Sequence, residues 1–172
     1  IKASIDATGP TYEYIRRPAK WSAVKGHILE FGERYNDQYR KIRFSMNLVW
    51  QLANCFTTKE WLPELFDLFY VNENFKKITS NRDNIIIINC YGRDITLDGV
   101  PDSMKHYILD DLNDLLKDWS HIPQAKLNIE TLIKYTERAK WTNEHHSVFR
   151  RKFPLMDQYK KTDIFKLSPR FK

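Results

Sequence analysis

The stretch Asn84–Cys90 reads Asn-Ile-Ile-Ile-Ile-Asn-Cys and carries the strongest β-strand pattern of this chain. Four consecutive β-branched residues are typical of a strand that is covered on both faces. Residues 91–93, Tyr-Gly-Arg, supply a turn, and Asp94–Leu97 is suited to a return strand. We therefore predict one small antiparallel β-hairpin near residues 84–97, to which Phe75–Thr79 could add a third strand.

Helical patterns fill most of the remaining chain, and a hairpin of this size needs helices packed on it to be stable in water. Apolar residues recur at intervals of three and four over residues 21–35, 39–56 and 101–119. A further helix that ends near Asn72 begins either at the Ser/Thr-x-x-Glu capping box of Thr57 or with Pro63 at its first helical position. Asn128 is suited to cap the last helix. The fold class that we predict is α+β, a predominantly helical single domain of about five helices.

Two glycines, Gly26 and Gly32, lie inside the helix predicted over residues 21–35. Each costs about 1 kcal/mol relative to alanine in a helix interior, so tertiary packing must hold this helix together. Glycine suits a helix position that another helix approaches closely. We therefore expect a close approach at these two residues.

Both ends of the chain are predicted to be extended arms on a globular domain at residues 21–140. Residues 1–20 show no helical period and contain two prolines, which favour extended or turn geometry. Tyr12 and Tyr14 would lay this arm over the body. Residues 141–172 form the second arm, a basic aromatic tail whose two prolines argue against one continuous helix.

The excess charge of the chain is confined to its C-terminal end. Residues 149–172 contain eight Lys or Arg and two Asp, which gives this segment the whole net charge of +6. The preceding 148 residues are balanced between acidic and basic side chains. A neutral body with a basic tail indicates contact with an anionic partner.

The tail and a smaller N-terminal cluster are the candidate binding site. Cations interleaved with aromatic rings suit phosphate neutralisation and base stacking, the two contributions that drive binding to single-stranded nucleic acid. The candidate cations are Arg150, Arg151, Lys152, Lys160, Lys161, Arg170 and Lys172, assisted by Arg16 and Arg17. The candidate stacking or anchoring rings are Phe153, Tyr159, Phe165 and Phe171.

Three interpretations of this tail stay open. Its apolar residues could fold back over the body, or the tail could grip RNA or DNA, or it could contact protein or an anionic membrane surface. We predict a non-enzymatic structural or binding subunit of a larger assembly that grips an anionic partner, with RNA favoured. The alternative is a protein-interaction or viral matrix-type structural protein whose tail contacts protein or an anionic membrane.

No short motif of an enzyme or cofactor site is present, so no catalytic residue, metal or cofactor is predicted. The chain lacks the phosphate-binding glycine loops, the nucleophile-elbow serine motif, the His-Glu-x-x-His zinc motif and the Cys-x-x-Cys pair. Asp110, Asp114 and Asp118 are spaced along one helix face, but such a stripe is typical of a solvated surface.

The cysteines and the hydropathy of the chain indicate the kind of compartment in which the protein works. Cys55 and Cys90 lie in apolar runs and are predicted to be buried free thiols, which suits an intracellular reducing compartment. No apolar run approaches the roughly 18 to 20 residues that span a bilayer, so no transmembrane segment is predicted. The tryptophans are predicted to pack in the core, with exposed anchors of a protein interface as the alternative.

Overall fold

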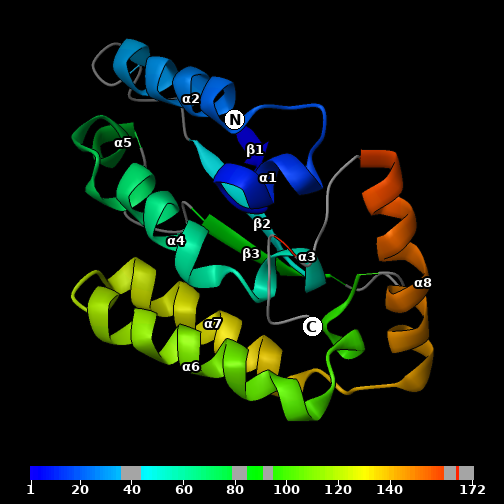
Figure 1. Cartoon of the computed structure of the whole chain (residues 1–172). Helices are drawn as coiled ribbons and strands as arrows, with labels where there is room; N and C mark the ends of the chain where they lie inside the picture. Colours follow the sequence, from blue (N-terminus) through cyan, green and yellow to red (C-terminus); the bar gives the residue numbers. More distant parts are fainter. Residues whose placement is uncertain (36–43, 79–84, 91–94, 161–165, 167–172) are drawn as a thin grey trace.

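The computed structural model describes residues 1–35, 44–78, 85–90, 95–160 and 166 (Figure 1). Three parallel strands, in the order β1-β2-β3, form a sheet: β1 (Lys2–Ser4), β2 (Ser45–Trp50) and β3 (Ile85–Asn89). The α-helices are α1 (Gly9–Ile15), α2 (Trp21–Tyr35), α3 (Leu52–Cys55), α4 (Thr58–Phe66), α5 (Glu73–Ile78), α6 (Asp102–Trp119), α7 (Pro123–Arg138) and α8 (Asn143–Lys160). A π-helix, η1 (Asp67–Val71), continues α4, and η2 (Leu97–Gly99) is a 3₁₀-helix.

The sheet is parallel, so the predicted antiparallel hairpin near residues 84–97 is wrong. β3 pairs with β2, with Met46 opposite Ile85 and Trp50 opposite Asn89. In the predicted return strand Asp94–Leu97, the described residues form a turn and the start of η2, while Asp94 lies outside the described residues. Parallel neighbours require a long crossover, and α3, α4, η1 and α5 supply it between β2 and β3.

Part of the helix predicted over residues 39–56 is strand β2. Met46, Leu48 and Trp50 are 0% exposed and alternate with half-buried neighbours, which is the period of two expected of a strand. The apolar Val49 on the opposite face made the same residues fit a helix that is apolar all round. Within the described part of the predicted helix, only α3 is helical, and residues 39–43 are not described.

The described residues contain eight α-helices rather than about five, and the described parts of both ends are folded rather than extended. Within residues 1–20, Gly9 has a left-handed φ of 53°, which glycine tolerates, and Pro10 fits the first turn of α1. The prediction that Tyr12 and Tyr14 pack on the body is confirmed, because both side chains are buried.

The described part of the C-terminal segment is helical rather than extended, and its helix runs through a proline. α8 includes Pro154, which has no N–H to donate to the carbonyl of Arg150. The neighbouring Phe153 is nevertheless buried in the core. Burial of this ring offsets the missing backbone hydrogen bond, and the helix continues to Lys160.

Three local predictions had mixed outcomes. The helices expected over residues 21–35 and 101–119 are confirmed as α2 and α6. Asn128 does not cap a helix but lies inside α7, where its amide donates to the Tyr70 hydroxyl. The capping box is not formed, because the Thr57 hydroxyl donates to the carbonyl of Asn54 instead of capping α4.

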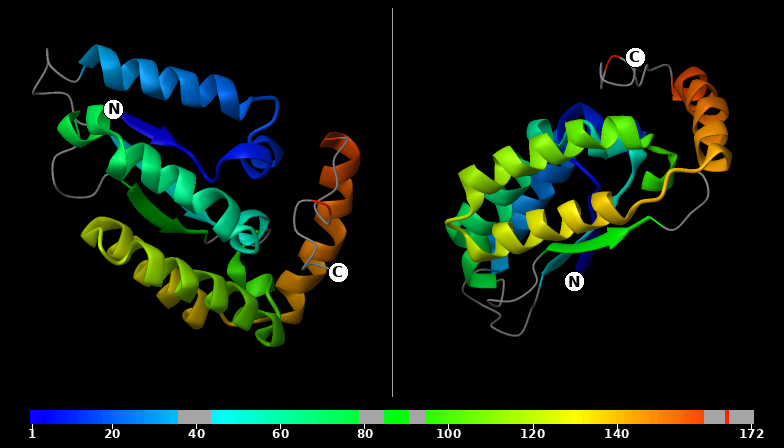
Figure 2. Two further views of the ribbon diagram at one scale, coloured as in Figure 1. Left: turned by 60° about the vertical axis from the view of Figure 1, so that its left-hand side comes forward. Right: turned by 90° about the horizontal axis from the view of Figure 1, so that it is seen from below.

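The helices gather on one side of the sheet, as the right-hand view of Figure 2 shows. On that side, Met46, Leu48 and Trp50 pack into the core with Trp61 and Leu62 of α4. α7 lies along β3 and α6 packs on α7 (Figure 1). Trp21, Trp50 and Trp61 are buried, as predicted for the tryptophans, whereas Trp119 is half-buried and Trp141 is 37% exposed.

The opposite face of the sheet is only partly covered. Val49 and Ile86 are half-buried there, and Ile88 is 37% exposed. Parallel sheets usually have helices on both faces. The expectation that the isoleucine stretch is covered on both faces is therefore wrong for the described residues.

Candidate anionic-partner surface

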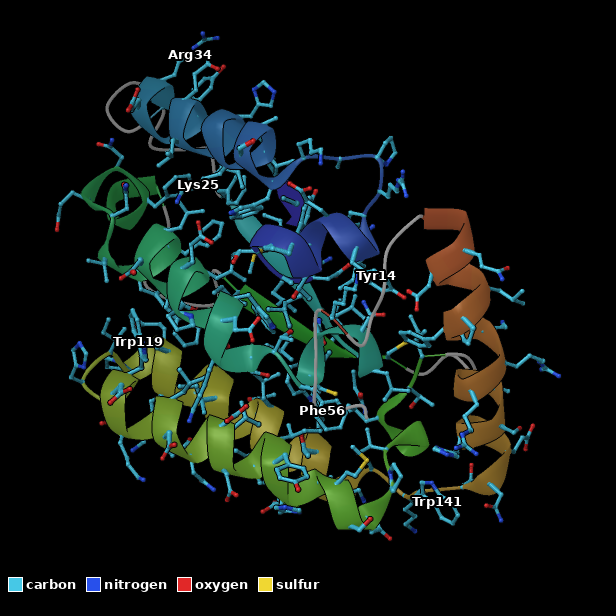
Figure 3. All side chains as sticks on the ribbon, viewed as in Figure 1. Tyr14, Lys25, Arg34, Phe56, Trp119 and Trp141 are labelled. Carbon is cyan, nitrogen blue, oxygen red and sulfur yellow. The ribbon has the colours of Figure 1, made fainter. Side chains whose placement is uncertain are left out.

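Phe153 anchors the basic helix α8 to the body of the protein. Its side chain is 1% exposed and its ring is stacked on Tyr14 of α1, with 6.4 Å between ring centroids and 15° between ring planes. Figure 3 shows Tyr14 at the end of α1 that faces α8. Phe153 thus acts as an anchor, and its ring is not presented to a partner in this structure.

The first turn of α8 is fixed to η2 by hydrogen bonds. The Thr142 hydroxyl caps the helix by accepting the His145 N–H at 3.2 Å. The Thr142 N–H donates to the carbonyl of Asp98 at 3.1 Å, and His146 Nδ1 lies 3.3 Å from the Gly99 carbonyl oxygen. These contacts set the direction in which α8 leaves the body.

Between this first turn and Phe153, α8 does not pack tightly. A cavity of about 330 Å³ lies beneath the helix and is lined mainly by apolar side chains. Leu52, Phe56 and Met104 contribute from the body, and Arg150 and Phe153 contribute from α8. The docking of α8 therefore depends on its start and on one aromatic anchor.

The described cations of the tail lie on more than one side of α8, and Arg150 is also part of the cavity lining. Arg150 and Arg151 are exposed, and Lys152 is half-buried. The structure describes only the backbone of Tyr159 and Lys160. The remaining candidates lie outside the described residues: Lys161, Phe165, Arg170, Phe171 and Lys172.

The two N-terminal cations differ in their surroundings. Arg16 donates from its guanidinium to the buried carboxylate of Asp6, with Nη2 and Oδ2 2.8 Å apart. Arg17 is exposed and follows Tyr14 by three residues. Tyr14 stacks on Phe153, and this contact links the segment that carries Arg16 and Arg17 to α8.

Lysine and carboxylate groups elsewhere on the described surface neutralise one another. Asp114 accepts hydrogen bonds from Lys117 at 2.9 Å and Lys59 at 2.7 Å, which hold the pKa of its carboxyl at about 2. Lys59 also lies 3.4 Å from the buried carboxylate of Asp111. This part of the predicted acidic stripe is thus occupied by the protein's own lysines.

Sequence reasoning missed a buried polar network at the carboxyl ends of β1 and β2. Asp6 Oδ1 accepts the Val49 N–H at 3.2 Å, and the Asn54 amide donates to the backbone carbonyls of Asp6 and Val49. An aspartate that follows a strand is a recognisable signal. It was not recognised because β1 itself was not predicted.

None of the described helices combines the length and apolarity that crossing a bilayer requires. Among the described residues, no group of three or more His, Cys, Asp or Glu side chains is placed to hold a metal ion. No protein-family model, no curated protein and no solved structure matches this chain significantly.

Proposed function

We propose that this protein is a non-enzymatic binding subunit that grips a polyanion, RNA in preference, with α8, the following tail and the N-terminal Arg17. The observation that carries the proposal is the stacking of Phe153 on Tyr14. The exposed Arg150 and Arg151 precede Phe153 on α8, and the exposed Arg17 follows Tyr14 in the chain, which supports a shared surface.

The charge distribution supports the same function. Three exposed cations, Arg17, Arg150 and Arg151, make no side-chain ion pair or hydrogen bond with another described residue, so their charge is available to phosphates. Other described lysines and arginines pair with carboxylates, as Lys59 and Lys117 do. Each phosphate neutralised by such a cation releases counterions, which makes binding depend on salt.

Charge substitutions test this proposal better than removal of the tail. Deleting α8 would also delete Phe153 and expose the core around Tyr14, so a loss of binding would have two causes. Arg150→Gln with Arg151→Gln removes two positive charges and leaves the anchor in place. Lys126→Gln with Lys134→Gln on α7 is the matched control, because it removes the same charge from a different helix.

The experiment is fluorescence anisotropy of a labelled single-stranded RNA with the full chain over a series of salt concentrations. We expect steep salt dependence, and the Arg150/Arg151 double variant should flatten the slope of log K against log salt by about 1.4. The control should retain the wild-type slope. The proposal would be overturned if the affinity of the wild type did not change with salt concentration. It would also be overturned if both double variants gave the same slope of log K against log salt.

One observation favours the alternative, an anionic membrane surface. Leu155 of α8 is 60% exposed and lies one turn after Arg151, so an apolar side chain and a cation share the outward face. Vesicles of phosphatidylcholine with and without phosphatidylserine separate the two partners. Binding to the anionic vesicles without binding to RNA would support the membrane alternative and reject RNA.

A further inference from the structure

A second cavity lies at the carboxyl end of β3, away from the anchor of α8. Its volume is about 480 Å³, within the range of small-molecule sites. Open α/β sheets bind ligands outside the carboxyl ends of their strands. The cavity is lined by Asn89, Cys90, Thr96, Asp98, Tyr135, Arg138, Ala139, Lys140 and His145.

One polar atom in this lining lacks a partner. Asn89 Oδ1 is buried and accepts no hydrogen bond from the described residues. A buried amide oxygen without a donor costs about 1 to 3 kcal/mol. A ligand that donates a hydrogen bond to Asn89 would remove this cost.

The charged groups of the lining favour an anion. Asp98 is already satisfied, because Oδ1 accepts the Lys140 N–H at 2.8 Å and Oδ2 accepts from the Thr96 hydroxyl at 3.3 Å. The side chains of Arg138 and Lys140 are exposed, and neither has an ion pair or hydrogen bond with another described residue. Two available cations and one satisfied carboxylate leave the site positive.

We propose that this cavity binds a small organic anion, a phosphate ester or a carboxylate, that also donates a hydrogen bond to Asn89. Arg138 and Lys140 hold the anionic group. The half-buried ring of Tyr135 contributes apolar contact area to the rest of the ligand. The site is independent of the polyanion surface, because Arg150 and Arg151 do not line it.

Cys90 provides a direct readout of occupancy. The chain has two cysteines, and Cys55 is fully buried, which raises the pKa of its thiol and keeps it unreactive. Cys90 is half-buried in the cavity lining. Alkylation of the folded protein by iodoacetamide, followed by mass spectrometry, therefore reports on Cys90.

The probes are inorganic phosphate, adenosine monophosphate and glutamate, each added to the full chain. A probe at ten times its Kd should slow alkylation of Cys90 about tenfold. Adenosine monophosphate and glutamate represent the phosphate-ester and carboxylate classes. Both carry N–H groups that can donate a hydrogen bond to Asn89, which inorganic phosphate lacks. Isothermal titration calorimetry gives a second readout that does not depend on the thiol.

Variants separate a specific site from general screening. Arg138→Gln with Lys140→Gln should abolish protection, whereas Lys134→Gln, an exposed lysine on the same helix outside the cavity, should keep it. Asn89→Ala should weaken the best organic probe about tenfold. The proposal is overturned if no probe binds by either readout up to about 10 mM, or if the double variant binds as well as wild type.

Discussion

Arg16 and Asp6 form an ion pair in which one partner is 2% exposed and the other 40%. The carboxylate of Asp6 also accepts the Val49 N–H, and its backbone carbonyl accepts from Asn54. The pair therefore joins the segment after β1 to the carboxyl end of β2. Arg16 supports the fold through this pair, and Arg17 beside it is left for a partner.

Arg16→Ala should destabilise the protein by about 2 kcal/mol, because it leaves the buried charge of Asp6 without its cation. This destabilisation is smaller than the loss expected for a fully buried ion pair, because the side chain of Arg16 is 40% exposed to solvent. Arg17→Ala is the matched control and should change stability by less than about 0.5 kcal/mol. Urea unfolding measures both variants. Equal effects would contradict the role assigned to Arg16.

Gly32→Ala and Gly26→Ala should change stability in opposite directions. A Cβ at Gly32 would lie 2.7 Å from Cε2 of Phe75, whereas a Cβ at Gly26 has no atom within 4 Å. Gly32→Ala should therefore destabilise by about 1 to 3 kcal/mol through overpacking. Gly26→Ala should stabilise by about 0.5 to 1 kcal/mol through helix propensity.

Thermal unfolding of the two glycine variants under the same conditions decides this prediction. A stabilising Gly32→Ala variant would mean that α2 and α5 are not in contact at Phe75. The prediction also separates the two glycines of one helix, for which the sequence alone predicted the same close approach.

Phe153→Ala should detach α8 before it unfolds the body. The substitution removes the ring that packs on Tyr14 and enlarges the cavity of about 330 Å³ beneath the helix. The substitution should destabilise the docked helix by about 3 kcal/mol. The loss cannot exceed the free energy with which α8 docks, because the helix then detaches while the body stays folded. Hydrogen exchange should accelerate in residues 143–160 and stay unchanged in α6. Leu155→Ala, at an exposed position, is the control.

The Asp114 carboxyl should titrate with a pKa of about 2, held there by hydrogen bonds from Lys117 and Lys59. Because this pKa is below the ordinary value of 3.8, the contribution of Asp114 to stability is complete above about pH 4 and is lost as the pH falls towards 2. Carbon-detected NMR of the Asp114 side chain over a pH series measures this pKa. Lys59→Met should raise the pKa, and an ordinary wild-type value would contradict the pairing.

The helices that residues 21–35 and 101–119 form were predictable, because each shows one apolar stripe with a period of 3.6. The strands were harder to predict. Met46, Leu48 and Trp50 alternate with Ser45 and Asn47, but an apolar residue at Val49 makes the segment fit both periods. β1 has three residues, so no period can be read from it.

The pairing of β3 depended on contacts that a local pattern does not contain. An isoleucine stretch followed by a turn sequence fits a hairpin, but this strand pairs with β2, about forty residues earlier. The uninterrupted apolar stretch was the available signal for a parallel strand. Gly92 directly after the strand favoured the hairpin interpretation instead, because glycine is typical of turns.

The candidate cations could be predicted from charge alone, but their surroundings could not. Charge counting treats Arg16 and Arg17 alike, and only the position of Asp6 distinguishes them. Phe153 was grouped with the stacking rings because a sequence does not show which aromatic residue of a tail is buried. The cavity at Asn89 depends on the parallel pairing of β3 and was therefore not foreseeable.

The partly uncovered sheet has a consequence for behaviour at high concentration. Within the described residues, β3 has a hydrogen-bonded strand on one side only, and its five residues contain four isoleucines and no charge. An uncharged, β-branched edge strand offers unpaired backbone groups to other chains, and the short length of β3 limits this hazard. We expect self-association through Ile85–Asn89 to be opposed by mutual repulsion between molecules that each carry a net charge of +6.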